Sequence, residues 1–204
     1  MGLDGRLIPG REKLIGEGAA ETVALREGDT AIQAQDADTA LVARAQRGEG
    51  DALDQLYVRH RDQVYTLCLN LCGNREEAED LLQETFVCAY RALAKFRGGS
   101  RFSTWLHRIA VNLCHEAARR SQRRADPPAV AAGADTEVID NVRAALMRLR
   151  PHHRVVLVLR YQQSLSYQEI ADLLKWSLSR VKVTLHRAKR AFKDVYLQLD
   201  ETQP

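Results

Sequence analysis

The sequence predicts an all-α protein of two small helical domains joined by a flexible linker, the C-terminal domain containing a helix-turn-helix. Apolar residues recur at steps of three and four from residue 38 to about residue 199, and no segment alternates long enough to form a strand. A stretch rich in Pro, Ala and Gly interrupts this pattern once. The chain of 204 residues is long enough for two cores, each of roughly 70 to 85 residues.

The chain is expected to have four parts. Residues 1–36 hold six of the twelve glycines and have no sustained periodicity, so they offer little apolar surface to offset the entropy of ordering. We interpret them as a flexible N-terminal extension. Residues 37–121 are predicted to form the first domain, residues 122–136 the linker and residues 137–204 the second domain.

Capping signals divide the first domain into helices. One helix is expected to begin at Asp38, and Asp51 is a suitable N-cap for a second helix that ends at Gly73. Asn74 and Glu77 resemble a capping box, so a third helix is expected to start there. Its apolar positions predict one buried face, made by Leu82, Phe86, Ala89, Leu93 and Phe96.

Charge is uneven along this region. Five carboxylates and no Lys or Arg lie between Glu76 and Glu84, whereas nine Lys or Arg and one carboxylate lie between Arg91 and Arg124. The helix dipole alone favours carboxylates in a first turn, so the acidic segment is not specific by itself. Together the segments indicate an acidic surface for one partner and a basic surface for another.

The basic segment also contains aromatic residues. Phe96, Phe102 and Trp105 alternate with arginines. Aromatic rings and guanidinium planes stack on unpaired bases, while the positive charges follow the phosphate backbone of the nucleic acid. The alternative is that Phe102 and Trp105 only fill a helix junction, which we favour for Trp105. Better candidates for DNA contact share another helical face, namely Arg108, Asn112, His115 and Arg119.

The second domain is predicted to hold four helices. The first spans about residues 138–149, Pro151 opens the second, and Ser166 and Ser177 cap the last two. In the last helix an apolar face comprises Val181, Leu185, Ala188, Phe192 and Val195, and a basic face comprises Lys182, His186, Lys189 and Lys193, flanked by Arg180, Arg187 and Arg190. Such a helix suits the DNA major groove, although a solvated amphipathic helix has the same pattern.

Other features limit the function classes. The chain has no apolar run of about 20 residues and no signal peptide, so we expect a cytoplasmic protein. It has no glycine-rich phosphate loop, no metal-ligand spacing and no nucleophile with an obvious base, so we expect neither an enzyme nor a cofactor. Four cysteines lie in apolar helical patterns and are interpreted as core residues: Cys68, Cys72, Cys88 and Cys114.

Two segments resemble bacterial sigma factors of the extracytoplasmic-function group of the sigma-70 superfamily. DLLQETF followed by FRGGSRFSTWLHRIAVN is similar to region 2, and LSYQEIA followed by S-x-S-x-V-K-x-x-L-x-R-A is similar to region 4. The resemblance covers about residues 38–200. It implies a factor without cofactor or catalytic activity that binds RNA polymerase core through the beta-prime clamp and beta flap. Promoter DNA and an anti-sigma factor are the other implied partners.

The resemblance also implies site residues. Asp80, Gln83 and Glu84 match positions that bind the polymerase clamp. The residues expected to bind the melted −10 element are Phe96, Gly98, Gly99, Ser100, Arg101, Trp105, Arg108, Asn112, His115 and Arg119, with 98–101 as the base-selecting loop. Those expected to bind the −35 element are Arg180, Lys182, Val183, His186, Arg187, Lys189 and Arg190.

Three positions of the second domain depart from the family pattern. Lys175 replaces the usual turn glycine, Ser179-Arg180 replaces a Gly-Thr pair, and Val183-Thr184 replaces a Ser-Arg pair. A residue other than Gly in a left-handed turn costs about 1 kcal/mol, which the fold tolerates. The base preference at −35 is therefore the property most affected by these departures.

Two other classes of protein remain as alternatives. A stand-alone helix-turn-helix regulator would bind duplex DNA without polymerase, but it leaves the acidic helix and the aromatic loop unexplained. Co-purification with core polymerase separates these two. A thiol or metal sensor would use the four cysteines, and metal analysis with thiol counting tests that reading.

Overall fold

The computed structural model describes residues 37–124 and 137–200, and within these ranges every regular element is a helix, which confirms the all-α prediction. The N-terminal half (37–124) contains a helix over residues 37–46, α2 (Gly50–Cys72), α3 (Arg75–Ala92), a 3-10 turn η1 (Leu93–Lys95) and α4 (Phe102–Arg124). The C-terminal half (137–200) contains α5 (Glu137–Arg148), α6 (Pro151–Leu157), a π-helical turn η2 (Val158–Gln162), α7 (Tyr167–Leu174) and α8 (Leu178–Asp200). The predicted N-terminal extension and most of the predicted linker lie outside the described residues.

The ends of α2 and α3 follow the capping signals with one exception. Gly73 ends α2 in the left-handed conformation (φ 82°), and the Asn74 side chain accepts a hydrogen bond of 2.9 Å from the Glu77 N–H. The prediction that Asp51 caps α2 is wrong, because Glu49 occupies the N-cap position. Asp51 lies in the first turn, where a carboxylate is also favoured by the helix dipole, so the sequence signal was displaced by two residues.

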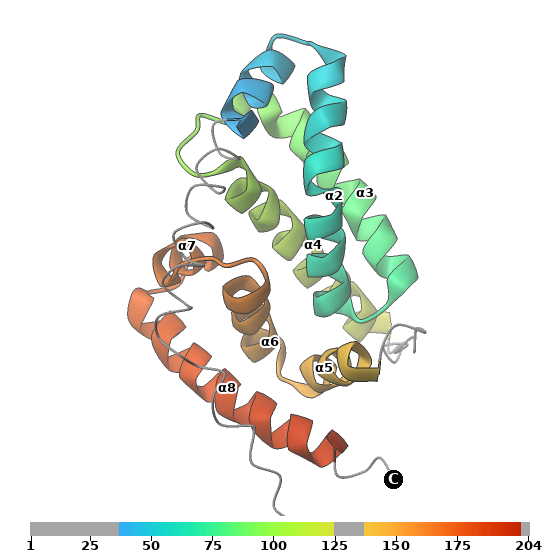
Figure 1. Ribbon diagram of the computed structural model, residues 1–204, viewed down its shortest axis with the longest axis vertical. Coiled ribbons are helices and arrows are strands. Elements are labelled where there is room, and N and C mark those ends of the chain that lie inside the picture. The colour runs from blue at the N-terminus through green and yellow to red at the C-terminus, as the bar shows by residue number, and fades with distance from the viewer. Residues whose placement is uncertain (1–36, 125–136, 201–204) are drawn as a thin grey trace, which may run out of the picture.

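The buried face of α3 is wider than the sequence pattern indicates. Phe86, Ala89 and Leu93 are buried as predicted, whereas Leu82 and Phe96 are only half-buried. Leu81 is buried in place of Leu82, because α3 packs between α2 and α4 and both neighbours cover it. Figure 1 shows these three helices grouped in the upper part of the molecule.

In the C-terminal half, α5 lies within one residue of its predicted range of about residues 138–149. The predicted linker starts too early, since α4 continues to Arg124. Ser166 and Glu169 form a reciprocal capping box at α7, and the Ser177 hydroxyl accepts a hydrogen bond of 3.2 Å from the Arg180 N–H. Lys175, at the family's glycine position, has the left-handed conformation (φ 55°). Pro151 lies in the first turn of α6 as expected.

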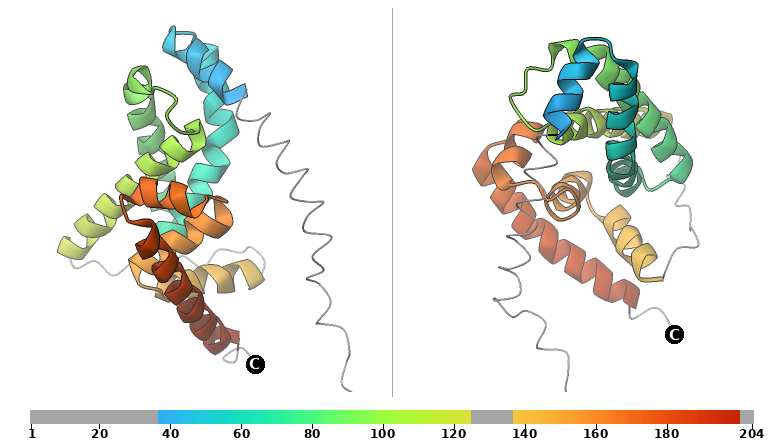
Figure 2. Two further views of the ribbon diagram at one scale, coloured as in Figure 1. Left: turned by 90° about the vertical axis from the view of Figure 1, so that its left-hand side faces the viewer. Right: turned by 45° about the horizontal axis from the view of Figure 1, so that its top comes forward.

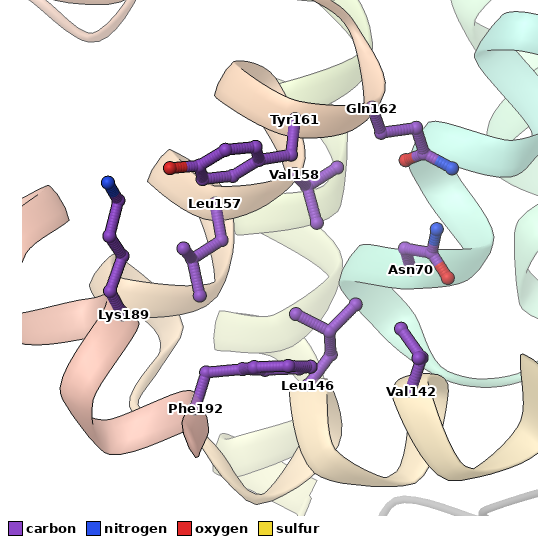
Figure 3. A pocket seen from close by; sticks show the side chains of 9 residues that line it. All are labelled: Asn70, Val142, Leu146, Leu157, Val158, Tyr161, Gln162, Lys189 and Phe192. Atoms are coloured by element: carbon purple, nitrogen blue, oxygen red, sulfur yellow. The ribbon is translucent and has the colours of Figure 1, made fainter. Parts of the chain in front are cut away.

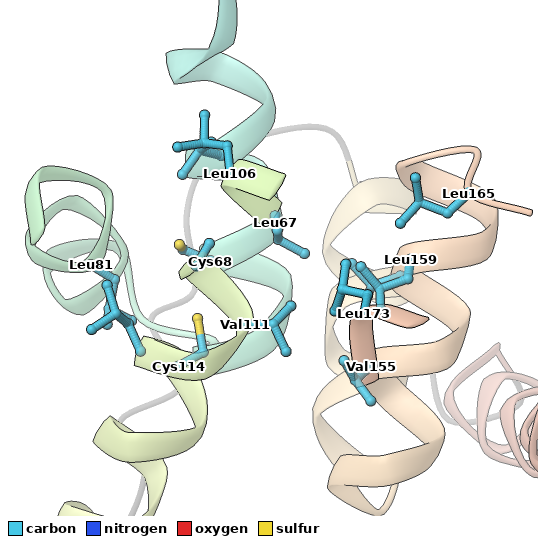
Figure 4. Close-up of a cluster of buried hydrophobic side chains, with 14 of the residues drawn as sticks. Leu67, Cys68, Leu81, Leu106, Val111, Cys114, Val155, Leu159, Leu165 and Leu173 are labelled. Atoms are coloured by element: carbon cyan, nitrogen blue, oxygen red, sulfur yellow. The ribbon is translucent and has the colours of Figure 1, made fainter. Parts of the chain in front are cut away.

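One apolar cluster runs through both halves. Leu67, Leu106 and Val111 contribute from the N-terminal half, and residues that include Val155 and Leu159 contribute from the C-terminal half (Figure 4). The halves therefore pack against one another, as the additional views in Figure 2 also show. The sequence pattern predicted two helical units but carried no signal for this contact.

Polar groups and a close backbone approach complete the contact between the halves. Arg154 of α6 donates a hydrogen bond of 2.6 Å to the carbonyl oxygen of Leu71 in α2. Gly73 lies against Met147 of α5, so that a Cβ atom at Gly73 would collide with the methionine side chain. Position 73 is therefore restricted both by its positive φ and by its neighbour.

Candidate functional site

The aromatic residues of the predicted DNA-binding segment pack on one another. The ring centroids of Phe96 and Trp105 are 5.0 Å apart, and those of Phe102 and Trp105 are 5.6 Å apart. Phe102 is buried and the other two rings are half-buried. Phe102 thus fills the junction between η1 and α4, while Phe96 and Trp105 keep part of their surface accessible for stacking.

A pocket of about 360 Å³ lies beside this aromatic group. The loop that precedes α4 forms one wall with Phe96, Arg97, Gly98, Ser100, Arg101 and Phe102, and the 37–46 helix forms the other with Thr39, Val42, Ala43 and Gln46. Gly98 has φ 71°, and nothing lies within 4 Å of the position a Cβ would take. The sequence prediction included the loop wall but missed the helix wall, since nothing in the sequence pairs residue 46 with residue 96.

Gln46 fixes the two walls to each other. Its Nε2 group donates one hydrogen bond of 3.0 Å to the carbonyl oxygen of Leu93 and another of 2.9 Å to that of Phe96. Both carbonyls belong to the end of the α3–η1 segment, where helix geometry leaves carbonyl oxygens without intrahelical donors. The amide of Gln46 therefore holds the start of the loop against the 37–46 helix.

Arg101 connects the loop to the C-terminal half. Its Nη2 atom lies 2.6 Å from Oε1 of Glu169 in α7, and the Thr104 hydroxyl donates to the same oxygen at 3.4 Å. Burial acts to raise the pKa of Glu169, but hydrogen bonds from Ser166 and Arg101 lower it overall. The carboxylate is thus kept ionised, and in this conformation Arg101 is engaged by protein rather than free for DNA.

The second predicted DNA-binding face lies along α4. Asn112, His115 and Arg119 are exposed, whereas Arg108 is half-buried. Burial, with a smaller contribution from Arg119, lowers the pKa of His115. Asn112, His115 and Arg119 also line a shallow pocket together with Pro151 of α6, so this face borders the C-terminal half.

Buried histidines lie behind the loop. His107 is 3% exposed, and burial, with smaller contributions from His60 and Arg101, lowers its pKa to about 4. Neither ring nitrogen of His107 has a hydrogen-bond partner among the described residues. His60 Nε2 lies 2.9 Å from a carboxylate oxygen of Asp38, which joins α2 to the start of the 37–46 helix. The sequence reading did not identify either histidine as a structural element.

The acidic surface occupies the solvent-facing side of α3. Asp80, Gln83 and Glu84 are all exposed, as their predicted role in partner binding requires. Val87, one turn further along, is also exposed (45%), an apolar surface residue that the sequence analysis did not identify. Burial raises the pKa of the neighbouring Glu77, while Arg120 of α4 opposes that shift.

The basic face of α8 is open to solvent. Val181, Leu185 and Ala188 are buried as predicted, and the residues on the opposite side are exposed, namely Arg180, Lys182, Val183, His186, Arg187, Lys189 and Arg190. Two of these cations rest on aromatic rings: Arg180 lies 4.0 Å from the ring centroid of Trp176, and Lys189 lies 5.6 Å from that of Tyr161. These contacts hold the two side chains near the helix surface.

The sequence reading also missed an apolar groove of about 450 Å³ on the C-terminal half (Figure 3). It lies between α5, η2 and α8, with Asn70 of α2 at one side. The apolar side chains lining it are Val142, Leu146, Leu157, Val158, Tyr161 and Phe192. No single helix carries the set, which explains why periodicity did not reveal it.

Cys68 and Cys114 are buried in the apolar core, as predicted, whereas Cys72 and Cys88 are half-buried and pack against it. A hydrogen bond with Cys68 and burial raise the pKa of Cys114 far above its usual range, and burial raises that of Cys72 to about 12. Thiols in this state react slowly, because the thiolate is the reactive form. In the described ranges, no three or more His, Cys, Asp and Glu side chains converge as metal ligands. No helix of the described part is both long and apolar enough to span a bilayer.

Comparison with known proteins places both halves in one family. Residues 56–124 match the family model of Sigma-70 region 2, and residues 139–192 match that of Sigma-70, region 4. The chain is 32% identical over 178 residues to the RNA polymerase sigma-H factor of Pseudomonas aeruginosa, covering 77% of this chain and 92% of that protein. It is 33% identical over 175 residues to the ECF RNA polymerase sigma-E factor of Salmonella typhimurium, covering 76% and 91%.

A solved structure has the same fold. The sigma factor RpoE from Bartonella quintana, crystallised in complex with the anti-sigma factor NepR, superimposes with a TM-score of 0.64 at 22% identity. The match covers 72% of this chain and 97% of that one. Both the N-terminal and the C-terminal half therefore have counterparts in a single known architecture.

Proposed function

Because the chain belongs to the sigma-70 family, as a sigma factor of the extracytoplasmic-function group, we propose that separate surfaces of it bind polymerase, the −10 element and the −35 element. A sigma factor of this group binds RNA polymerase core and directs promoter-specific transcription initiation. It acts by binding rather than by catalysis, and it needs no cofactor. We place it in the cytoplasm with the polymerase.

The pocket between the 37–46 helix and the loop 98–101 is the observation that carries the −10 assignment. Its volume of about 360 Å³, its lining by Arg97 and Arg101, and the half-buried ring of Phe96, on which Trp105 packs, suit an unstacked base with its backbone. Asn112, His115 and Arg119 extend this basic surface along α4, where the melted strand continues. Arg108 contributes charge from a half-buried position.

The exposed basic face of α8 is proposed to lie in the major groove of the −35 element. Recognition helices commonly place their N-terminal residues against base edges, so Lys182, His186 and Arg187 are assigned to the bases. Lys189 and Arg190, further along, are assigned to phosphates. Val183, 50% exposed, supplies an apolar contact of the kind that reads a thymine methyl group.

Two further surfaces are assigned to protein partners. Asp80, Gln83 and Glu84, with exposed Val87, are proposed to dock on the beta-prime clamp. The apolar groove on the C-terminal half is proposed to receive the beta flap, since it offers the apolar lining that a partner helix fills. The solved neighbour was crystallised with an anti-sigma factor, and we propose that this chain is also controlled by one.

Simultaneous use of both DNA surfaces requires the two halves to separate. A compact unit of about 150 residues is about 40 Å across. The names of the −10 and −35 elements place them about 25 base pairs apart, which corresponds to roughly 85 Å of duplex. The packed conformation therefore spans less than the promoter, and the Arg101–Glu169 contact must break when both elements are bound.

Residues 98–100 are already Gly-Gly-Ser, so replacement of Gly98–Arg101 by a Gly-Ser segment of equal length removes the Arg101 side chain and tests its part in the −10 assignment. Core binding should be retained, while the reactivity of promoter thymines to permanganate, which reports melting, should fall. A premelted template should restore part of the lost transcription, because the base no longer has to be unpaired. Normal melting by this variant would show that the Arg101 side chain takes no part in melting.

A further inference from the structure

Gln46 lies outside the residues that match the family model of region 2, yet it lines the proposed base pocket. Its side chain is exposed, so it is not required for core packing. Its hydrogen bonds to Leu93 and Phe96 nevertheless fix its orientation. Fixed polar groups on the wall of a binding pocket determine which ligands are accepted.

The fixed amide of Gln46 offers only one kind of hydrogen-bonding group to the pocket. A glutamine amide has two N–H donors on Nε2 and one acceptor oxygen, Oε1. Here both donors are used, one by each backbone carbonyl. Rotating the amide by 180° would place Oε1 against two carbonyl oxygens, so the orientation follows from the contacts. The polar group that Gln46 retains for a pocket occupant is therefore an acceptor.

Bases differ in what they offer to such an acceptor. At the edge position occupied by N6 of adenine and N4 of cytosine, both of which are amino groups, thymine and guanine instead carry the carbonyl oxygens O4 and O6. An acceptor on the wall that faces this position thus pairs with adenine or cytosine and repels the carbonyl oxygen of thymine or guanine. The arginines and Ser100 on the loop wall provide donors for the ring acceptors and the phosphates.

We propose that Gln46 is a specificity-determining residue of the −10 pocket, and that its Oε1 atom faces the N6 or N4 position of a flipped base and so selects adenine or cytosine, which carry an amino group there, over thymine. This inference rests on the proposed function of the pocket. It adds a second wall, from the 37–46 helix, to the loop that the family resemblance identifies. It also gives the direction of the base preference at one promoter position.

Holoenzyme binding to premelted promoters tests this directly. Each position of the non-template −10 strand is randomised in turn, and bound molecules are sequenced. At one position the unmodified protein should enrich adenine or cytosine over thymine by about three- to tenfold, the range expected for one hydrogen bond. Gln46→Met, which keeps the length of the side chain but has no amide, should reduce that enrichment to between about one- and twofold.

A second variant separates selectivity from loss of structure. In Gln46→Lys the ammonium still donates to the carbonyls of Leu93 and Phe96, but the acceptor is gone and a donor remains. The preference at the same position should turn towards thymine, and a misfolded variant would not gain a new preference. Arg47→Ala is the matched control, since Arg47 is the next residue, is exposed and pairs only with Glu49 among the described residues.

The outcomes distinguish the inference from the function on which it rests. Unchanged base preferences in both Gln46 variants, with a loop 98–101 variant that does lose its preference, would overturn the role of Gln46 and leave the pocket assignment intact. If neither the loop nor the Gln46 variants alter any −10 preference, the pocket assignment itself fails. A thymine preference in the unmodified protein would also overturn the inference.

Discussion

Arg101 and Glu169, which are 68 residues apart in the sequence, form an ion pair in which Nη2 lies 2.6 Å from Oε1. The arginine belongs to the loop proposed to select a base, and the glutamate belongs to the helix that precedes the proposed −35 reader. Each side chain is about one-third exposed, so the pair lies at the edge of the contact between the halves. The packed conformation therefore engages a residue that we propose binds the −10 element.

The first prediction is that Glu169→Ala increases separation of the two halves in the free protein. The variant removes the ion pair and the hydrogen bond from Thr104. Distances between spin labels on the exposed positions Val58 and Val183 should broaden towards longer values. Glu169 also completes the capping box of α7, so part of any effect could come from that helix.

Two variants resolve that ambiguity. Arg101→Ala removes the pair and leaves the capping box, whereas Ser166→Ala weakens the cap by about 1 kcal/mol and leaves the pair. The broadening should follow Arg101→Ala and be absent in Ser166→Ala. The reverse pattern would assign the effect to the cap.

The second prediction concerns acid stability. The pKa of His107 is about 4 in the folded protein because of burial, whereas an unfolded histidine has a pKa of about 6.5. The unfolded state therefore binds the proton more tightly, and stability is lost as pH falls from about 6.5 to about 4. The full effect is on the order of 3 kcal/mol. Among the groups that act on its pKa, His60 and Arg101 lower it further, and Glu169 raises it.

Urea unfolding at about pH 7 and about pH 5 measures this dependence. His107→Leu, which removes the titrating group at similar volume, should flatten the pH dependence between these values. His152→Gln is the control, because His152 is exposed. The pKa of Glu169 is lowered, so its own contribution disappears only below about pH 4.5 and does not confuse the comparison.

The third prediction concerns polymerase binding. Glu84→Lys reverses a charge on the exposed face of α3, and the affinity for core polymerase should fall by about tenfold or more while the thermal midpoint changes little. Asp62→Lys is the charge-matched control, since the Asp62 side chain is 88% exposed and belongs to another helix, α2. Equal affinity of the two variants in a competition assay would contradict the clamp assignment.

The fourth prediction concerns −35 recognition by α8. Lys182→Ala or Arg187→Ala should each cost about 1 to 3 kcal/mol at one base position and change the motif obtained from a randomised promoter. Lys193→Ala, near the other end of the exposed face, should weaken binding to all promoter sequences alike. If every variant lowers affinity equally and the motif does not change, α8 is an electrostatic anchor and the base assignments are wrong.

The fifth prediction concerns the turn between α7 and α8. Lys175 has φ 55°, a conformation that costs a residue with a Cβ atom about 1 kcal/mol relative to glycine. Lys175→Gly should therefore raise the free energy of unfolding by up to about 1 kcal/mol, reduced by the greater entropy of glycine in the unfolded chain. Lys189→Gly, inside α8, should lower stability by about the same amount. A loss of stability in Lys175→Gly would show that its side chain has a stabilising contact.

Local chemistry made much of the fold predictable. The Asn74 cap, the Gly73 terminus and the Ser166 capping box involve groups within a few residues, and each is found where the sequence placed it. The predictions that Asp51 caps α2 and that Leu82 is buried were wrong, each for its own reason. A carboxylate is favourable at several positions of a first turn, and a helix with two neighbours buries more than one line of residues.

The exposure of the expected site residues was predictable mainly where one segment carries them. The loop 98–101 and the basic face of α8 are each continuous in sequence, and their expected residues are exposed apart from half-buried Ser100 and from Arg101, which pairs with Glu169. Gln46 and the apolar groove depend on contacts between distant elements. Gln46 and Phe96 are 50 residues apart in the sequence and come together through packing, which hydrophobic periodicity does not encode.

The contacts between the halves differ in chemistry from one end to the other. Beside the N-terminus of α4 the contact with α7 includes the Arg101–Glu169 ion pair, whereas at α2, α5 and α6 it includes the Arg154–Leu71 hydrogen bond and the packing of Met147 on Gly73. Dissolved salt screens partly exposed charges over about 10 Å at 0.1 M and leaves apolar packing unweakened. Rising ionic strength should therefore loosen the α4–α7 end first and free the base-selecting loop while the α2–α5 end stays closed.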